Sequence, residues 1–276
     1  MTNLTRDLWG FAGEPGVGHR YRERVSNAEE RRRATVAVTA GVGERLGDLG
    51  GQVRETLQDV KPRLRGWLHA ACAPLTLAAG VVLVTLSPNA STRVGSAVFA
   101  TSALVLFTVS AVYHRGTWSP RAFRFLRRFD HANIFLLIAG SYTPFTLLLL
   151  DGVDRVVLLA TVWTGAVLGV LFRVFWTDAP RWLHTPIYIA MGWAAIFFMP
   201  AFLHGATRLG VGVGIATFTM IVVGGALYTF GGAVYGFKRP NPWPRTFGFH
   251  EVFHTFTILA FMAHYVGVSL ATYSLR

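Results

Sequence analysis

Long apolar stretches alternate with short polar segments from about residue 66 to the end of the chain. Each stretch is long enough to cross the hydrocarbon core of a bilayer as a helix, which takes about 20 residues. Glycine and proline within a stretch do not exclude a spanning helix, because neighbouring helices can satisfy the freed backbone groups. The pattern predicts an all-α polytopic membrane protein, a seven-transmembrane helix bundle with spans near residues 67–87, 95–114, 131–150, 156–176, 183–203, 211–235 and 249–272.

The first 65 residues differ from the rest in their polarity. They hold twelve of the 26 Lys and Arg residues and nine of the 14 Asp and Glu residues. We predict two domains: residues 1–65 form a cytosolic charged extension with an amphipathic helix on the inner leaflet, and residues 66–276 form the seven-transmembrane domain. A partly ordered tail is the alternative for the extension. Apolar residues at steps of three and four make the predicted helical stripe: Val42, Leu46, Leu49, Val53, Leu57, Val60 and Leu64.

The distribution of charged residues predicts how the chain is oriented in the membrane. Only 14% of the residues are charged, whereas a soluble domain carries about 25%. The net charge of +12 is compatible with nucleic-acid binding, but the basic residues beyond the extension lie mostly in short segments on one side of the predicted spans, as the positive-inside rule expects. We therefore predict a multi-pass protein of the plasma membrane with a cytosolic N-terminus and an external C-terminus. Its expected partners are membrane lipids and not nucleic acid, and its single cysteine, Cys72, excludes an internal disulfide.

Polar and ionisable residues gather at the predicted cytosolic ends of the spans. Such residues are costly within a membrane and usually have a function. The topology puts them at one membrane depth although they are distant in sequence. They are Ser110 and His114 on the second span, Asp130 and His131 on the third, His250, Glu251 and His254 on the seventh, and His69 and His184 on the first and fifth.

Spacing turns part of this cluster into a candidate metal site. His250 and His254 differ by roughly 40° in direction and about 6 Å in rise on a helix, so both imidazoles can reach one metal ion. His114 ends a span on the same side and is the best third ligand. Three histidines with water in the fourth position make an open zinc site, so we predict bound Zn²⁺. Asp130 is expected to orient or deprotonate the zinc-bound water, and Ser110 is expected to support the site.

The same segment admits a second interpretation. His250-Glu251-x-x-His254 matches the H-E-x-x-H signature of soluble zinc proteases, in which the glutamate is the general base. The helix here opens a membrane span, and residues 255–272 carry no further ligand pattern of that class. We favour Glu251 as a helix-start carboxylate stabilised by the macrodipole, with the general base as the alternative.

The remaining membrane histidines receive other roles. For His69 and His184 we expect interfacial hydrogen bonding, the ordinary role of a lone histidine at a membrane edge. His131 follows Asp130 directly, so it points elsewhere and is expected to be structural or supporting. His264 lies about 15 Å deeper than His254 along the helix, too far to share the metal, but it could line a cavity.

These segments together resemble the haemolysin III proteins, the bacterial branch of the progestin and adipoQ receptor (PAQR) family. The resemblance covers roughly residues 66–276. It depends on the order of four motifs, none specific alone: Ser110-Ala-Val-Tyr-His114, the run from Asp130-His131 to Tyr142-Thr143-Pro144, Tyr235-Gly-Phe-Lys-Arg-Pro240, and His250-Glu-Val-Phe-His254 with His264. The long charged extension departs from the short bacterial form, and Gly66-Trp67-Leu68-His69 matches the opening of the first helix only in part.

The resemblance implies a seven-helix bundle with a cytosolic N-terminus and zinc near the cytosolic face. It assigns His114, His250 and His254 as ligands, with Asp130 beside the zinc water and Ser110 nearby. The family belongs to a wider group that looks like membrane hydrolases of lipid amides, including alkaline ceramidases. Receptor members are linked to lipid metabolism and membrane fluidity.

Three functions follow as hypotheses. The leading one is a zinc-dependent membrane hydrolase that cleaves a lipid amide or ester through a zinc-bound water. The second is a non-catalytic zinc protein that senses or tunes the lipid state of the membrane. The third is a cytolytic pore, which the seven near-continuous apolar spans argue against, because a secreted toxin would not be built in this way.

Overall fold

The computed structural model describes residues 36, 39, 42–43 and 62–276, and Lys61–Arg276 forms one compact unit. The amphipathic helix predicted for the N-terminal extension falls almost entirely outside the described residues. The two-domain division and the alternative of a partly ordered tail therefore stay predictions.

Seven long apolar helical segments make up the compact unit, and the prediction of an all-α seven-helix bundle is confirmed. One segment consists of three consecutive pieces, α6, η1 and α7. The elements are α2 (Trp67–Thr85), α3 (Ala90–Arg115), α4 (Pro120–Leu149), α5 (Gly152–Phe175), α6 (Arg181–Gly192), the 3₁₀ helix η1 (Trp193–Phe198), α7 (Met199–Thr207), α8 (Val211–Phe237) and α9 (Phe249–Tyr273).

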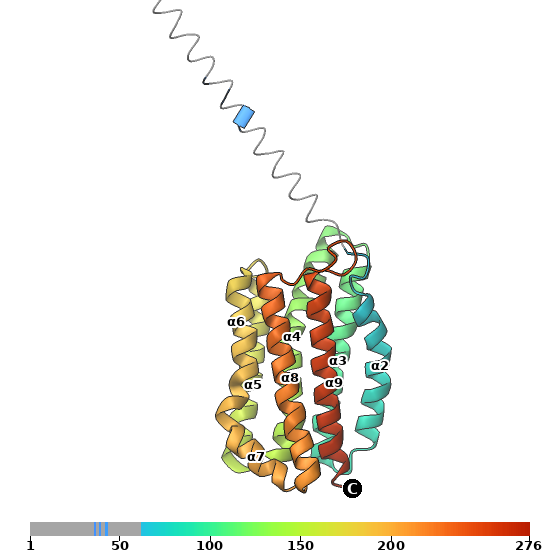
Figure 1. The fold of residues 1–276 in the computed structure, drawn as a ribbon, viewed down its shortest axis with the longest axis vertical. Helices are drawn as coiled ribbons and strands as arrows, with labels where there is room; N and C mark the ends of the chain where they lie inside the picture. Colours follow the sequence, from blue (N-terminus) through green and yellow to red (C-terminus); the bar gives the residue numbers. More distant parts are fainter. Residues whose placement is uncertain (1–35, 37–38, 40–41, 44–61) are drawn as a thin grey trace, which may run out of the picture. The chain divides into compact units, whose positions relative to one another are not determined.

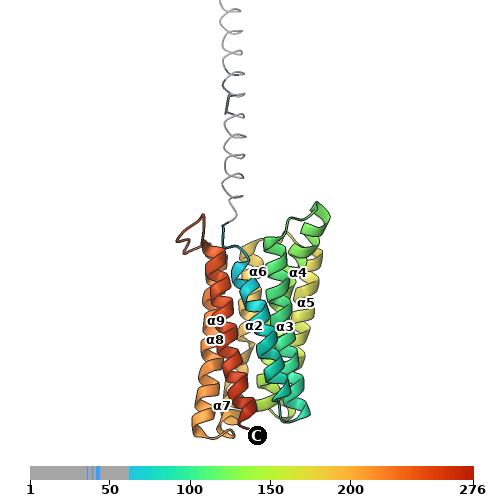
Figure 2. The ribbon, with the colours of Figure 1, turned by 90° about the vertical axis from the view of Figure 1, so that its right-hand side faces the viewer.

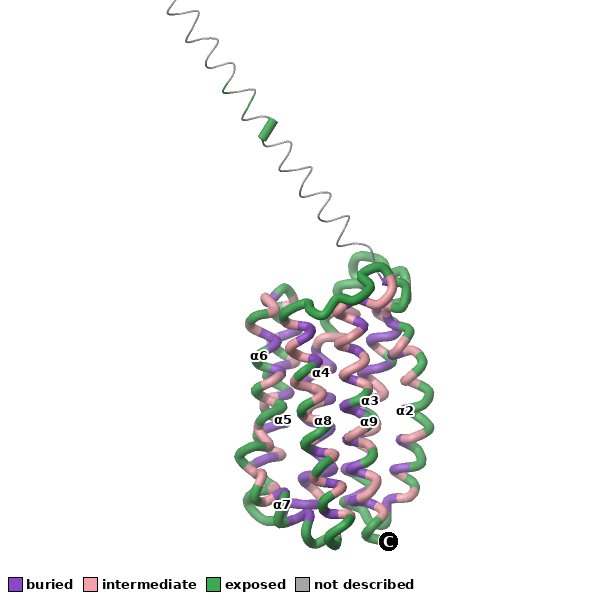
Figure 3. The backbone as a smooth tube through the Cα atoms, viewed as in Figure 1, coloured by how far each residue is buried: buried purple, intermediate pink, exposed green. Residues whose placement is uncertain are grey.

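The helices run antiparallel, and consecutive helices pack side by side (Figures 1 and 2). We call the end at which α2, α4, α6 and α9 begin the upper end, and the opposite end the lower end, as Figure 1 draws them. α4 is the most enclosed helix, since 67% of its apolar window is buried against 22% for α5 and α8. Figure 3 shows buried positions on the inward faces and exposed positions on the outer faces of the peripheral helices.

α4 begins about ten residues earlier than the sequence pattern indicates. Ser119 caps the helix by accepting a hydrogen bond from the Ala122 N–H at 3.4 Å, and Pro120 occupies the first turn. Both residues are typical of a helix start. The apolar pattern missed this turn and the next two because they are rich in arginine. Asp130 therefore does not open the helix but lies within it.

The fifth span is broken in the middle, which the sequence pattern did not predict. α6 gives way to η1 after Gly192, and Pro200 lies in the first turn of α7. The Tyr142 hydroxyl of α4 bridges the break, since it accepts from the Ala195 N–H at 2.9 Å and donates to the Gly192 carbonyl. A side chain on a neighbouring helix thus satisfies backbone groups that the break frees.

An ion-pair cluster and a close backbone contact fasten the lower end. Asp151 pairs with Arg155 and with Arg208, and the Arg208 guanidinium also donates to the Leu149 carbonyl at 2.6 Å. Gly205 of α7 lies so close to α4 that a Cβ atom would overlap the Leu149 carbonyl. These contacts join the end of α4 to α5 and α7.

Candidate metal centre

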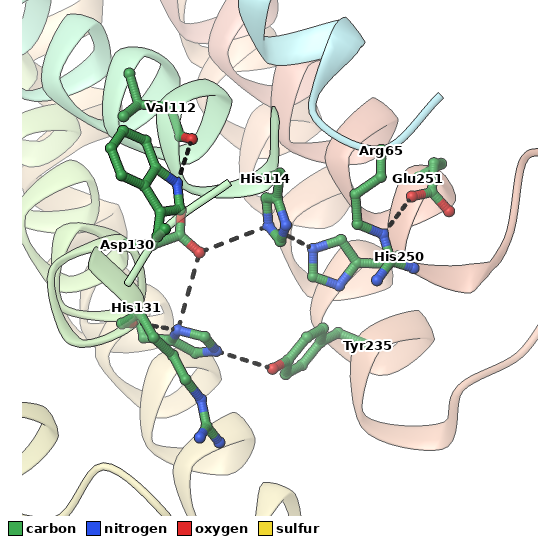
Figure 4. Close-up of polar contacts among 10 residues, drawn as sticks. Arg65, Val112, His114, Asp130, His131, Tyr235, His250 and Glu251 are labelled. Carbon is green, nitrogen blue, oxygen red and sulfur yellow. Dashed lines mark hydrogen bonds and ion pairs between the residues drawn. The ribbon is translucent and has the colours of Figure 1, made fainter. Parts of the chain in front are cut away.

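Three histidines converge at the upper end of the bundle. His114 comes from the last turn of α3, and His250 and His254 come from the first turns of α9. One ring nitrogen from each lies within 4.8 Å of the other two, and the Nε2 atoms of His114 and His250 are 3.2 Å apart. Figure 4 shows two of these rings facing each other from the two helices. The sequence prediction that these three side chains meet is thus matched by the geometry.

The start of α9 is held in place by Glu251. Its carboxylate accepts from the Gly248 N–H through Oε2 and from Arg65 Nε through Oε1, each at 2.8 Å. Arg65 is itself positioned by a short backbone pairing, in which the Arg63 and Leu64 N–H groups donate to residues 245 and 246. Both carboxylate oxygens are therefore engaged by groups outside the histidine cluster, and Figure 4 shows the contact with Arg65. This supports the helix-start role of Glu251 over that of a general base.

Asp130 lies beside the histidine cluster. Its Oδ2 atom is 3.8 Å from His114 Nε2 and 3.8 Å from His131 Nδ1. The Ser110 side chain, which is buried on α3, interacts with the Asp130 carboxylate as a hydrogen-bond donor. Both residues line the same cavity as His250 and His254.

His131 does not belong to the metal-ligating group and instead supports its edge. Its Nδ1 atom lies 2.7 Å from the Arg127 carbonyl. A carbonyl only accepts, so Nδ1 carries the proton and Nε2 is left to accept from the Tyr235 hydroxyl at 3.4 Å. The supporting role expected for His131 agrees with this geometry, whereas Tyr235 had not been identified as part of the site.

The expectation of interfacial hydrogen bonding for His69 was wrong. Its ring stacks on the ring of His254, with 3.8 Å between centroids and 16° between planes. Neither of its nitrogens has a hydrogen-bond partner among the described residues, and the side chain is buried. His69 thus lies behind a candidate ligand and fixes the plane of its ring. Only its position in the first turn of the first span hinted at this.

A cavity of about 450 Å³ extends from the histidine cluster into the bundle. Its upper part includes Asp130, His250 and His254, and its deeper part reaches His264 and Tyr228. The expectation that His264 lines a cavity is therefore confirmed. Most of the wall between these ends is apolar, formed by side chains such as Leu106, Ile134, Ile138, Phe145, Ile196 and Phe202.

The donor set fits a transition-metal ion. Two Nε2 atoms 3.2 Å apart can share one proton, or both can direct lone pairs at one cation. His254 adds a third imidazole, and its Nδ1 atom is buried without a hydrogen-bond partner in the described part of the chain. Three imidazoles with room for a further ligand are typical of zinc sites. Among the described residues, this is the only group of three or more metal-ligating side chains.

Comparisons with known proteins agree with this architecture. The model of a family described as "Haemolysin-III related" matches residues 57–265. A protein named Hemolysin-3 from Bacillus cereus is 30% identical over 193 residues, which cover 69% of this chain and 82% of the relative. A Hemolysin-3 homolog from Bacillus subtilis (strain 168) is also 30% identical over 193 residues, covering 69% of this chain and 84% of the relative. The chain therefore belongs to the haemolysin III family of multi-pass membrane proteins.

Proposed function

We propose that this protein is a zinc-dependent membrane hydrolase that cleaves a lipid amide or ester. One observation carries the proposal: a single cavity joins two of the three converging histidines and Asp130 to a long apolar interior. A polar centre next to an apolar channel suits a substrate with a cleavable head group and a hydrocarbon chain.

Zinc is the metal that best matches His114, His250 and His254 as ligands. When bound, zinc supplies a Lewis acid and lowers the pKa of a coordinated water to about 7. The protein supports this role by holding the ligand rings rigidly, through the stacking of His69 on His254 and through the Glu251 anchor at the start of α9.

Asp130 is the proposed general base and acid. Its Oδ2 atom, 3.8 Å from His114 Nε2, takes the proton of the attacking water and delivers it to the leaving nitrogen or oxygen. The Ser110 hydroxyl, which interacts with Asp130, orients that carboxylate and can donate to the scissile carbonyl. The hydrocarbon chain of the substrate occupies the apolar part of the cavity, toward His264.

The upper end is proposed to face the cytosol, with the protein in the plasma membrane. Besides the buried Arg173, eleven Lys and Arg residues near the helix ends and in the connecting segments lie at the upper end, which the positive-inside rule assigns to the cytosol. They are Arg63, Arg65, Arg115, Arg121, Arg124, Arg127, Arg128, Arg181, Lys238, Arg239 and Arg245. The substrate would then come from the inner leaflet.

A non-catalytic zinc protein that acts in membrane lipid homeostasis or sensing is the second candidate. It is favoured by the closeness of Asp130 to His114, because a small shift would let the carboxylate take the fourth position on the metal and close the site. The names of the two Bacillus relatives refer to haemolysis, but seven apolar helices within one bundle do not suit a secreted cytolytic pore.

Hydrolysis by zinc-loaded protein tests the proposal. Purified wild type is incubated with short-chain ceramides and matched fatty esters, beside Asp130→Asn and the control Asp154→Asn at the exposed lower end. We expect wild type and the control to release fatty acid, and Asp130→Asn to lose at least about 100-fold in rate with its zinc content unchanged. Absence of product from wild type on every substrate, or an undiminished rate in Asp130→Asn, would exclude the hydrolase; zinc retained in that case would favour the second candidate.

A further inference from the structure

Arg173 is buried near the end of α5, and no described residue forms an ion pair with it. Its side chain is among the largest fully buried ones, and only 1% of the residue is exposed. The Nε and Nη1 atoms make no hydrogen bond with any described residue. A buried cation without a partner is strongly unfavourable, so the native protein is expected to supply an anion.

No carboxylate of the described part of the chain takes that place. The Asp130 carboxylate lies 3.8 Å from ring nitrogens of His114 and His131, and Glu251 pairs with Arg65. Asp178, five residues along the chain from Arg173, is exposed and pairs with Arg127. The counterion of Arg173 therefore has to come from outside these residues.

Further buried polar atoms without hydrogen-bond partners among the described residues lie in the first two turns of α6. Arg181 Nη1, His184 Nδ1 and Thr185 Oγ1 are buried and make no hydrogen bond with the described residues. α6 also begins after Pro180 without a side-chain cap, so its positive end adds to the field. We call Arg173, Arg181, His184 and Thr185 the Arg173 cluster.

Members of the Arg173 cluster lie around the ring of Tyr235. The Arg181 guanidinium lies 5.0 Å from the centre of the Tyr235 ring, and the His184 ring lies 5.9 Å from it. Arg173 interacts electrostatically with both His184 and Tyr235. Donors from the end of α5 and the start of α6 thus surround one region at the upper end of the bundle.

The chemistry of the cluster selects an anionic phosphate. Arginine pairs with phosphate through parallel hydrogen bonds, and hydroxyl and imidazole groups add further donors. Exposed aromatic residues next to the cluster, Phe175, Trp176 and Trp182, mark the membrane–water interface, where phospholipid phosphates lie. The cluster contains no carboxylate to receive the ammonium group of a zwitterionic lipid, which favours a headgroup with net negative charge.

We propose that the Arg173 cluster binds the phosphate of an anionic phospholipid between the end of α5 and the start of α6. This site is distinct from the metal centre and does not depend on hydrolase activity. It adjoins the substrate cavity, because Thr185 of the cluster lines that cavity, as does Tyr235, which contacts the cluster. An occupied site would therefore stabilise one wall of the cavity.

Lipid titration of the purified full-length protein in a phosphate-free maltoside detergent tests the site. Phosphatidylglycerol, phosphatidylcholine and inorganic phosphate are added separately, and native mass spectrometry counts bound lipid while thermal unfolding measures protection. We expect wild type to retain phosphatidylglycerol in preference to phosphatidylcholine. Arg173→Met should raise the dissociation constant for phosphatidylglycerol about 10-fold or more, since it removes charge-assisted hydrogen bonds. Arg124→Gln, an exposed charge at the same end, should bind as wild type does.

Thermal unfolding measured without anionic lipid distinguishes a loss of lipid binding in Arg173→Met from misfolding of that variant. In phosphatidylcholine, Arg173→Met should unfold at the same temperature as wild type or higher, because it removes an unpaired buried charge. Equal binding of the two lipids by wild type, undiminished binding by Arg173→Met, or equal destabilisation of that variant in both lipids would overturn the site. Equal protection by inorganic phosphate would keep an anion site and overturn the lipid as its source.

Discussion

The two ends of the bundle differ in whether they bury long polar side chains without a hydrogen-bond partner among the described residues. At the lower end, Asp151 and Arg208 are exposed, with 60% and 44% of their side chains accessible, and they pair with each other. At the upper end, Arg173 and His69 are fully buried and have no hydrogen-bond partner in the described part of the chain. Exposed, paired charges need nothing further, whereas buried donors and acceptors without partners are costly. The difference indicates that the charged residues of the lower end fasten the helices together, whereas those of the upper end are arranged to bind ligands.

The largest expected effect is at the histidine cluster. His254→Ala removes one of the three proposed ligands, and we expect the zinc content of the folded protein to fall from about one per chain to nearly none. His204→Ala, an exposed histidine at the lower end, is the matched control and should keep its zinc. Metal analysis of purified protein measures both. Full zinc in folded His254→Ala protein would show that the upper cluster is not the metal centre.

Removal of the Glu251 carboxylate should give the next largest effect, a loss of stability. Glu251→Ala leaves Arg65 unpaired and uncaps α9, at a cost of about 3 kcal/mol in the free energy of unfolding. The value is at the low end for a buried pair because the Arg65 side chain is 23% exposed and can be hydrated. Glu251→Gln keeps an acceptor for the Gly248 N–H and should lose less. Unfolding in mixed micelles of SDS measures both variants.

The glutamine variant also tests the protease-like role. A general base loses its function when its carboxylate becomes an amide, whereas a helix anchor loses only part of its stability. Glu251→Gln protein that is as stable as wild type but inactive, with its zinc retained, would restore Glu251 as the base.

The sequence predicted those parts of the fold that leave a pattern of apolar residues. Seven spans follow from hydropathy because the bilayer imposes one length on each helix. The start of α4 was missed because its first turns, from Pro120 onward, are helical but basic, and hydropathy detects only the part within the membrane. The break after Gly192 was missed because it depends on Tyr142, which lies 50 residues earlier and repairs the freed backbone.

The spacing of the histidines predicted their convergence at the candidate metal site, but it could not predict which residues surround that site. His250 and His254 share a helix, so their i, i+4 relation is local, and topology added His114. The stacking of His69 on His254 depends on how α2 packs against α9. Arg173 lacks a counterion among the described residues, and no spacing pattern predicts such an absence.

A close packing contact at the lower end should give a smaller loss of stability. Gly205→Ala places a methyl group against the Leu149 carbonyl, which belongs to the backbone and cannot rotate away. We expect about 1–3 kcal/mol of destabilisation. Gly225→Ala in α8 is the control, since apart from its chain neighbours and the nearby backbone of its own helix no atom lies within 4 Å of the added Cβ. Equal unfolding curves for the two variants would show that α7 is not held tightly against α4.

The smallest effect is expected for the exposed ion pair that closes the lower end. A hydrogen bond from Arg208 lowers the pKa of Asp151 below its usual range. A depressed pKa stabilises the folded protein above the unfolded value of about 4, and the stabilisation is lost as pH falls through the folded pKa. Asp151→Asn should therefore unfold slightly below wild type at pH 7, and the gap should close under strongly acidic conditions. Asp154→Asn is the control, because Asp154 forms no ion pair with a described residue, and thermal unfolding between pH 7 and pH 2 measures all three proteins. If wild type and Asp151→Asn still differ in unfolding temperature at pH 2, the Asp151 side chain acts through its shape and not its charge. The contrast between the two ends would then have no electrostatic basis.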